Sequence, residues 1–286
     1  MDQTFSQLLE KATQRLADEQ IVTADLDARL LLQAASGYER AQYLSHEFAV
    51  CPSTIASLYE TYISRRILHE PVYRILGVRE FHGLKFKLGK DTLEPRDDTE
   101  CLIEAVVARI TDKNADLRFL DLGTGTGIIA LSLLSELSKA EADATDISAG
   151  ALKVAQENSS ALGFRDRIRF QKGSWLEAAS GQYDFIVSNP PYIDQDMMEH
   201  LEAEVLNHDP SAALDGGLRG LEAFEEIFKT ATGFLKQDGF LALEIGFDQL
   251  RSVTDLGEGY GWHRLSFHRD LSGQMRSVIF NPSAYG

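Results

Sequence analysis

Apolar side chains recur at helical spacing through the first quarter of the chain. Two stretches show the i, i+3, i+4 pattern of an amphipathic helix: Phe5, Leu8, Leu9, Ala12 and Leu16, and then Ile55, Leu58, Tyr59, Tyr62 and Ile63. Between them the same period runs through Leu26, Leu30, Leu31 and Ala34. It stops at Gly37, a residue typical of a helix C-cap. The pattern predicts a small helical domain over residues 1–75.

The pattern changes after residue 75 to short alternating stretches separated by glycines. Polar and apolar residues alternate over residues 80–88. Gly83 interrupts this stretch, and Gly77 and Gly89 flank it. Alternation bounded by glycines is typical of a β-hairpin. We therefore expect residues 76–94 to form a β-hairpin linker between two domains.

The remainder of the chain, residues 95–286, alternates apolar strands with amphipathic helices. The expected strands are residues 118–122, 142–147, 168–171, 183–188 and 240–245. This alternation is typical of a parallel α/β sheet. Residues 263–268 and 276–280 instead predict a closing pair of strands around the Asp-Leu-Ser-Gly sequence at 270–273.

Composition and charge narrow the classes of function. The chain has 286 residues, a length that favours two domains, and 28 Lys and Arg against 44 Asp and Glu give a net charge of −16. Such acidity argues against binding to a phosphate backbone. No apolar run approaches the ~20 residues of a membrane span, and the N-terminal stretch is acidic and helical where a signal peptide is basic and apolar. We expect a cytoplasmic protein without membrane or direct nucleic-acid contact.

Metal binding finds no support in the sequence. The two cysteines, Cys51 and Cys101, form no Cys-x-x-Cys motif, and the seven histidines are scattered. Neither a disulfide framework nor a zinc site is therefore expected.

A glycine-rich loop, Gly123, Thr124, Gly125, Thr126 and Gly127, joins the first expected strand of the sheet to an apolar helix. Glycines at this place let the backbone approach a ligand closely, and the new helix offers free N–H groups to an anionic group. A tight turn without a ligand is the alternative. A dinucleotide motif would have its third glycine at position 128, where this chain has isoleucine, and this argues against a nicotinamide or flavin enzyme.

Asp146 ends the next expected strand, nineteen residues after Gly127. A carboxylate in this position can accept hydrogen bonds from both hydroxyls of a ribose. Capping of the following helix is the alternative, although Ser148 is at least as well placed for that role.

A rigid segment, Asn189, Pro190, Pro191 and Tyr192, follows the strand at 183–188. Each proline fixes its own φ and holds the preceding residue in an extended conformation. The side-chain carbonyl of Asn189 and the backbone carbonyl of Pro190 can accept hydrogen bonds from one planar NH2 group, and Tyr192 can cover its face. A rigid surface turn is the alternative.

These motifs together resemble those of class I S-adenosylmethionine-dependent aminomethyltransferases. Further segments make the chain similar, over essentially its whole length, to the protein-glutamine N5-methyltransferases that modify peptide-chain release factors: residues 74–77, 80–81, 91–96, 99–100, 209–220 and 270–273. The resemblance implies a Rossmann-like, mostly parallel seven-stranded sheet with an antiparallel closing strand, plus the helical domain and the hairpin linker. It also implies methyl transfer to the glutamine of the release factors' Gly-Gly-Gln loop, with the helical domain docking that substrate in translation termination.

The resemblance also assigns roles to residues. It implies that S-adenosylmethionine, and its product S-adenosylhomocysteine, bind Gly123, Thr124, Gly125, Thr126, Gly127, Asp146, Ile147, Trp175 and Asn189. It implies that Asn189, Pro190 and Tyr192 are catalytic and that these three and Pro191 contact the substrate. The chain departs from the family pattern at Asp97-Asp98, where Pro-Glu is common, and at Ser174, where an acid is common. Ser174 puts in doubt a carboxylate contact to the adenine amino group, although Trp175 can still pack on the adenine ring.

Three alternatives stay open. A glutamine methyltransferase can act on a ribosomal protein, and a DNA or RNA amino-group methyltransferase uses a similar rigid segment, although the acidic charge disfavours the latter. A non-catalytic module on this fold would have no need of the intact segment at 189–192. We expect the protein to be a monomer.

Overall fold

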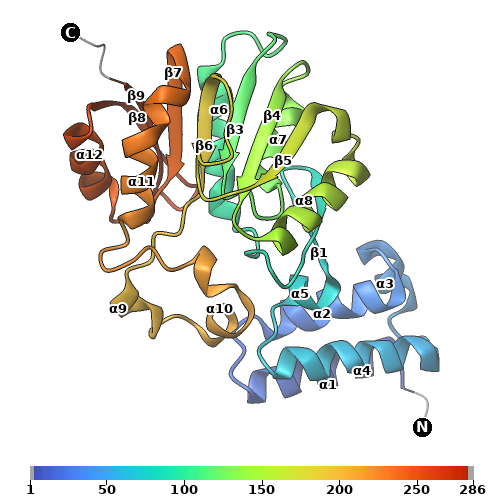
Figure 1. The fold of residues 1–286 in the computed structure, drawn as a ribbon. Helices are drawn as coiled ribbons and strands as arrows, with labels where there is room; N and C mark the ends of the chain where they lie inside the picture. The colour runs from blue at the N-terminus through green and yellow to red at the C-terminus, as the bar shows by residue number, and fades with distance from the viewer. Residues whose placement is uncertain (1–2, 283–286) are drawn as a thin grey trace. The chain divides into compact units, whose positions relative to one another are not determined.

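The computed structural model describes residues 3–282 and divides the chain into two compact units (Figure 1). The helical unit comprises Met1–Val78 with Ala203–His208, and the sheet unit comprises Arg79–Glu202 with Asp209–Gly286. The sequence pattern does not predict that residues 203–208 group with the N-terminal helices. The domain limits at 1–75, 76–94 and 95–286 stay a prediction, and their outermost residues, 1–2 and 283–286, lie outside the described part.

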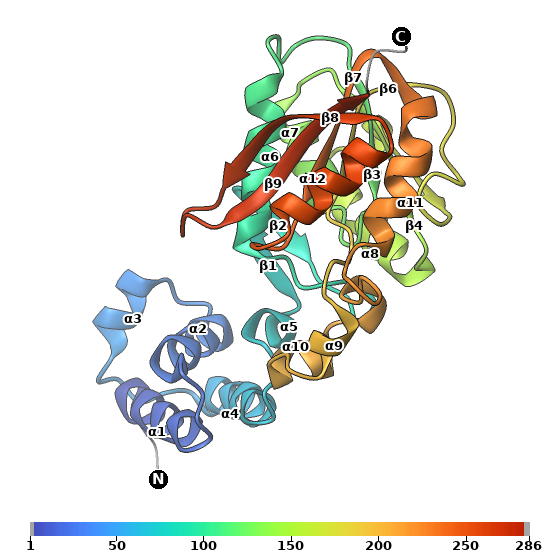
Figure 2. The same cartoon turned by 90° about the vertical axis from the view of Figure 1, so that its left-hand side faces the viewer.

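The helical unit is built around a single apolar core. Its helices are α1 (Phe5–Asp18), α2 (Ala24–Ser36), α3 (Arg40–His46), α4 (Ser53–Ile67), α5 (Val72–Leu76) and α10 (Ala203–His208). The helices α1, α2 and α4 pack against one another (Figure 2). Phe5, Leu16 and Leu31 are fully buried in their core. The predicted C-cap is found at Gly37, which ends α2 with a φ of 69°.

The hairpin consists of β1 (Val78–Phe81) and β2 (Leu84–Lys87). The turn between them contains Gly83, with a φ of 70°. Phe81 and Phe86, one from each strand of the hairpin, are buried in the core of the sheet unit.

Within the described residues, the sheet unit contains a seven-stranded sheet in the order β5-β4-β3-β6-β7-β9-β8. Its strands are β3 (Arg118–Leu122), β4 (Glu141–Asp146), β5 (Ile168–Lys172), β6 (Tyr183–Ser188), β7 (Leu235–Glu244), β8 (Trp262–Arg269) and β9 (Met275–Pro282). Neighbouring strands from β5 to β7 are parallel, whereas β9 runs antiparallel to both β7 and β8. The predicted mostly parallel sheet with an antiparallel closing strand is confirmed.

Helices cover both faces of this sheet. They are α6 (Glu100–Arg109), α7 (Ile128–Glu136), α8 (Ala149–Leu162), α11 (Glu222–Thr230) and α12 (Leu250–Gly259), with the short α9 (Gln195–Met198) and the 3-10 turns η1 (Asp97–Thr99), η2 (Arg165–Arg167), η3 (Ser211–Ala213) and η4 (Ala231–Phe234). Successive strand residues alternate between two cores, one shared with α6 and α7 and the other with α11 and α12. No helix of the described residues is both long and apolar enough to cross a membrane.

Three phenylalanines form a ladder across the centre of the sheet. The ring centroids of Phe119 and Phe185 lie 4.7 Å apart, and those of Phe185 and Phe240 lie 5.2 Å apart, with nearly parallel planes. They come from β3, β6 and β7 and are buried in the core shared with α6 and α7. This packing fixes the relative register of the strands whose carboxyl ends carry the predicted site.

Candidate active site

A cavity of about 530 Å³ lies at the carboxyl ends of β3, β4 and β6. Its wall includes seven of the predicted site residues: Gly123, Gly125, Asp146, Ile147, Trp175, Asn189 and Pro191. The remaining predicted residues, Thr124, Thr126, Gly127, Pro190 and Tyr192, are neighbours in sequence that do not line it. Parallel strands place their following loops at one edge of the sheet, so distant segments of the chain converge here.

The glycine loop has a backbone that favours glycine at three positions. Gly123, Gly125 and Gly127 have φ values of 69°, 57° and 81°. A Cβ on Gly127 would lie 3.3 Å from the Cβ of Ala155 in α8, so this glycine also serves helix packing. A Cβ on Gly125 would meet nothing within 4 Å, which leaves open space for a ligand beside the backbone.

A buried acid in β3, Asp121, anchors the glycine loop through hydrogen bonds. Asp121 in β3 is fully buried, and its Oδ2 accepts hydrogen bonds from Thr124 Oγ1 at 2.6 Å and from the Ala130 backbone N–H at 3.3 Å. Burial raises the pKa of Asp121 to about 7, even though these hydrogen bonds act in the opposite direction. The role of Thr124 seen in the structure is therefore to tie the loop to β3.

Asp146 connects the loop to β4. Its Oδ2 accepts a hydrogen bond from the Gly125 backbone N–H at 2.9 Å, and its Oδ1 accepts one from the Ser148 N–H at 2.8 Å. Ser148 is the N-cap of α8, where its hydroxyl accepts from the Ala151 N–H. Each carboxylate oxygen has a second lone pair, so Asp146 can hold the loop and still accept hydrogen bonds from a ligand.

Trp175 and Ile147 supply the apolar part of the wall. Trp175 has a φ of 45°, unusual for a residue with a side chain, and its backbone carbonyl accepts a hydrogen bond from Thr145 Oγ1 at 2.9 Å. Ile147 is 67% exposed, although it is a large apolar residue. An aromatic ring and an exposed aliphatic side chain in one cavity suit a flat, partly apolar ligand group.

The segment Asn189–Tyr192, called the arm below, leaves β6 at the cavity. Asn189 is half-buried, and its amide nitrogen donates a hydrogen bond to Thr99 Oγ1 at 3.3 Å. Pro190 is buried, and Tyr192 packs against the core shared with α11 and α12. Burial raises the pKa of Tyr192, which keeps its hydroxyl neutral.

The segment that contains Gly216 and Gly220 packs closely against the backbone of the arm. A Cβ on Gly216 would lie 2.8 Å from the Cα of Tyr192, and one on Gly220 would lie 2.3 Å from the Tyr192 backbone oxygen. Gln249 Nε2 donates to the backbone oxygens of Tyr192 at 3.0 Å and of Gly220 at 3.2 Å. Sequence reasoning missed Gln249, because a lone glutamine between a strand and a helix carries no local signal.

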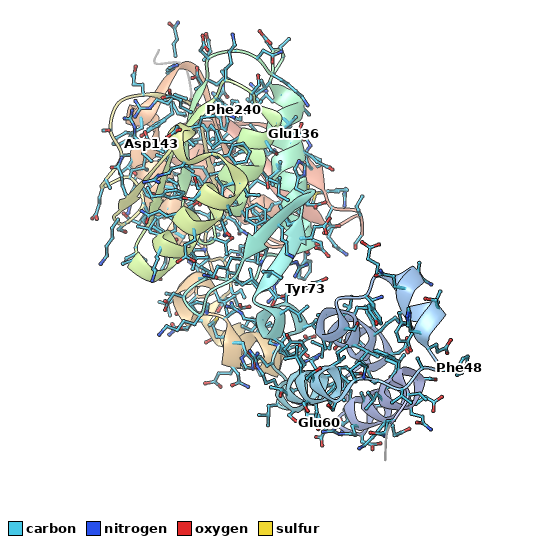
Figure 3. The ribbon with its side chains drawn as sticks, turned by 90° about the vertical axis from the view of Figure 1, so that its right-hand side faces the viewer. Phe48, Glu60, Tyr73, Glu136, Asp143 and Phe240 are labelled. Carbon is cyan, nitrogen blue, oxygen red and sulfur yellow. The ribbon has the colours of Figure 1, made fainter. Side chains whose placement is uncertain are left out.

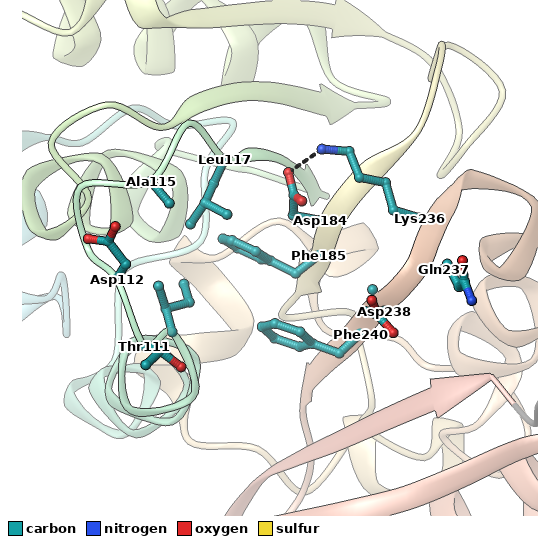
Figure 4. A pocket seen from close by; sticks show the side chains of 12 residues that line it. Thr111, Asp112, Ala115, Leu117, Asp184, Phe185, Lys236, Gln237, Asp238 and Phe240 are labelled. Carbon is teal, nitrogen blue, oxygen red and sulfur yellow. Dashed lines mark hydrogen bonds and ion pairs between the residues drawn. The ribbon is translucent and has the colours of Figure 1, made fainter.

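A second cavity, of about 380 Å³, lies at the opposite edge of the sheet (Figure 4). Leu117, Phe185 and Phe240 form its apolar floor, and Asp184 pairs with Lys236 at 2.7 Å at its margin. It contains none of the predicted site residues. Within the described residues, no group of His, Cys, Asp and Glu is arranged to hold a metal ion.

The fold and the motifs at its carboxyl edge define a class I methyltransferase. The sequence matches two families, the Methyltransferase small domain over residues 97–217 and the PrmC N-terminal domain over residues 7–77. The chain belongs to the release factor glutamine methyltransferase family, as the sequence resemblance predicts.

Relatives support this assignment, and a solved structure shares the fold. The chain is 40% identical to a release factor glutamine methyltransferase of Agrobacterium fabrum, over 98% of each protein. It is 41% identical to one of Cereibacter sphaeroides, over 94% of this chain and 95% of the relative. A crystal structure of a methyltransferase from Pyrococcus furiosus matches with a TM-score of 0.55 at 19% identity, over 77% of this chain and 98% of the other, and shows the common fold.

Proposed function

We propose that this chain transfers a methyl group from S-adenosylmethionine to the side-chain amide nitrogen of the glutamine in the Gly-Gly-Gln loop of peptide-chain release factors. The observation that carries the proposal is that Asn189, on its stiff arm, lines the same cavity as the glycine loop and Asp146. The names of the relatives at about 40% identity support the release factor as substrate.

The charges of the cavity suit S-adenosylmethionine, which would supply a methyl group activated on a cationic sulfonium. Its described lining contains no lysine or arginine and five acids: Asp91, Asp146, Asp215, Glu222 and Glu226. Such a wall favours a ligand with cationic sulfonium and ammonium groups and repels phosphates. Asp146 would hold the ribose, the backbone of Gly123 and Gly125 would contact the ligand closely, and Ile147 and Trp175 would pack on the adenine.

The arm would orient the substrate amide. An amide nitrogen is a poor nucleophile because its lone pair is delocalised into the carbonyl group. Hydrogen bonds from its NH2 group to Asn189 Oδ1 and to the Pro190 carbonyl would increase the electron density on nitrogen and fix its direction. Orientation of this kind can supply up to ~7–11 kcal/mol of a barrier. Pro191 and Tyr192 complete the proposed substrate contacts, and the released proton can pass to water.

The helical unit would dock the release factor, in a cytoplasmic monomer that binds neither nucleic acid nor membrane. The net charge of −16 supports the exclusion of nucleic acid. The match of residues 7–77 to the PrmC N-terminal domain supports a distinct role for these helices.

The test is incubation of the purified protein with methyl-labelled S-adenosylmethionine and, separately, release factors, ribosomal proteins and DNA. We expect label on a release factor, and peptide mass spectrometry should locate it on the glutamine of the Gly-Gly-Gln loop. Label on a ribosomal protein alone would change the substrate, and label on DNA alone would overturn the proposal.

A further inference from the structure

Glu244, the last residue of β7, is a buried acid to which the proposed function gives no role. It is 1% exposed and pairs in register with Ser277 of β9. An acid at this depth is costly unless it is hydrogen bonded or protonated. Its position at the carboxyl end of β7, next to β6, places it at the base of the arm.

The partners of Glu244 connect it to Asn189. Interactions with the side chains of Thr99 and Asn189 lower the pKa of its carboxyl group. Thr99, itself 2% exposed, also accepts a hydrogen bond from the Asn189 amide nitrogen at 3.3 Å. Thus the NH2 end of Asn189 lies toward Thr99 and Glu244. The Oε2 atom of Glu244 has no hydrogen-bond partner among the described residues.

We propose that Glu244 is a positioning residue, which with Thr99 binds the NH2 group of Asn189 and so leaves Asn189 Oδ1 for the substrate. This proposal rests on the proposed function. The two ends of an asparagine amide have nearly the same shape, so steric fit alone does not select one orientation. The inverted orientation would present a donor to the substrate's NH2 group, which also donates. An acceptor on the side of Asn189 that faces away from the substrate excludes that orientation, because it would then face the amide oxygen, which is also an acceptor.

The charge state of Glu244 decides how well it can bind the NH2 group of Asn189. Burial raises its pKa to about 7. The groups that face it are Asp98 on η1, Cys101 on α6, Tyr192 on the arm and Arg276 on β9. Asp98 raises the pKa of Glu244, whereas Arg276 lowers it. The ionised carboxylate only accepts hydrogen bonds, whereas the protonated acid also donates one and competes with the required orientation of Asn189.

Arg276 is fixed by two carboxylates. It forms ion pairs with Asp98 and Asp270, each at 2.9 Å. Asp98 lies in the Asp97-Asp98 pair where the sequence departs from the family pattern. Glu is common at position 98, so Asp98 keeps a carboxylate there as a partner for Arg276, and Asp270 provides the other from the segment between β8 and β9.

The first experiment needs no catalysis. The side-chain NH2 signals of Asn189 are followed by ¹H–¹⁵N NMR against pH, with Asn189→Ala used to assign them. In the parent protein we expect these signals to shift with a midpoint near pH 7, and in Glu244→Gln this titration should be absent. A titration that persists in Glu244→Gln would overturn the proposal.

The second experiment measures turnover of the same variants. Glu244→Ala should lower kcat by about tenfold to a hundredfold, because the amide loses its fixed direction. Affinity for S-adenosylmethionine should be unchanged. The isosteric Glu244→Gln keeps an acceptor, so it should recover part of kcat and abolish the rise of kcat with pH around 7. An unchanged kcat in Glu244→Ala would overturn the proposal.

Asp143→Asn is the matched control. Asp143, on β4, is another buried acid of the same sheet (Figure 3). It accepts a hydrogen bond from Tyr183 Oη at 2.9 Å. Its replacement should leave the titration of Asn189 and the pH profile as in the parent protein, and loss of either would count against a specific role for Glu244. A parent protein that methylates no glutamine would instead overturn the proposed function, while the NMR titration would still decide the role of Glu244.

Discussion

Asp146 combines two tasks in one carboxylate. It holds the backbone N–H groups of Gly125 and Ser148, and it lines the cavity. Asp146→Ala should therefore weaken binding of S-adenosylmethionine and S-adenosylhomocysteine by ~1.5–3 kcal/mol, the value of a charge-assisted hydrogen bond. Calorimetry measures this change. Asp166→Ala, an exposed acid in η2, is the control, and equal affinities in all three proteins would remove the ribose from this site.

Asn189 separates chemistry from cofactor binding. Asn189→Ala removes the proposed amide acceptor and leaves the glycine loop intact. Methyl transfer should fall by about a hundredfold, since the substrate amide is no longer oriented, while most of the cofactor affinity remains. Single-turnover transfer of labelled methyl groups, beside calorimetry, checks both. Near-normal turnover would show that the arm does not orient the substrate.

Gly220 does not line the cavity, but its backbone lies against the arm, so its replacement should disturb the arm. It has a φ of 64°, and a Cβ there would lie 2.3 Å from the Tyr192 backbone oxygen. Gly220→Ala should displace the arm and lower kcat by about tenfold or more. Gly233→Ala is the control, because a Cβ there meets nothing within 4 Å. If Gly220→Ala had the kcat of Gly233→Ala, the support of the arm would not matter for turnover.

At the scale of elements, local patterns predicted the strands and the long helices. Alternating or helical periodicity persists over enough residues in β3, β6 and α1 to identify each of them. Short elements carry no such signal, and α10, with six residues, is one of these. A local pattern also does not show which elements far apart in the sequence pack against one another. The site shows the same limit, because Thr99 and Gln249 form hydrogen bonds with the arm although both lie far from it in the sequence.

The helical unit contains a buried ion pair that the pattern of apolar residues did not reveal. Arg66 on α4 is 3% exposed and pairs with Asp27 on α2 at 2.7 Å and with Glu204 on α10 at 2.6 Å. These contacts explain why α10 groups with the N-terminal helices. Because both partners come from other helices, Arg66 joins three elements of the unit.

Removing Asp27, a partner of the buried Arg66, should lower the stability of the helical unit strongly. Asp27→Ala should destabilise the helical unit by ~3–5 kcal/mol, because a buried guanidinium loses its most buried counter-charge. Hydrogen exchange of α2 and α4 measures this loss. The control is Asp25→Ala, which breaks the exposed pair with Arg29 on the same helix and should cost at most ~1 kcal/mol. Equal protection in both variants would mean that Asp27 contributes no more than a surface charge.

At the scale of the whole molecule, acidity has two separate consequences. Most of the 44 acids are at least partly exposed and set the net charge of −16. Asp121 and Glu244 are instead fully buried, and burial raises the pKa of each to about 7. Composition predicts the first consequence, whereas the second depends on which strands surround an acid, and sequence alone does not show this.

These two acids should make the sheet unit less stable as pH rises through neutrality. A carboxyl group whose pKa is higher in the folded than in the unfolded chain binds its proton more tightly when folded. Its stabilising effect is complete below the unfolded pKa, near 4, and is lost as pH rises to about 7. A tenfold difference in proton affinity between the folded and unfolded chain corresponds to ~1.4 kcal/mol, so the two groups together should contribute on the order of a few kcal/mol.

Comparison with Asp121→Asn/Glu244→Gln isolates this effect from other titrations, because the variant lacks both buried carboxyl groups and retains the other acids. Both tryptophans of the chain, Trp175 and Trp262, lie in the sheet unit, so their fluorescence during thermal unfolding reports on that unit. The unfolding temperature of the parent protein should fall relative to the variant between pH 5 and pH 8. A constant difference across this range would show that neither carboxyl group takes up a proton on folding, and Glu244 would then be ionised, and able to hold Asn189, at every pH of the range.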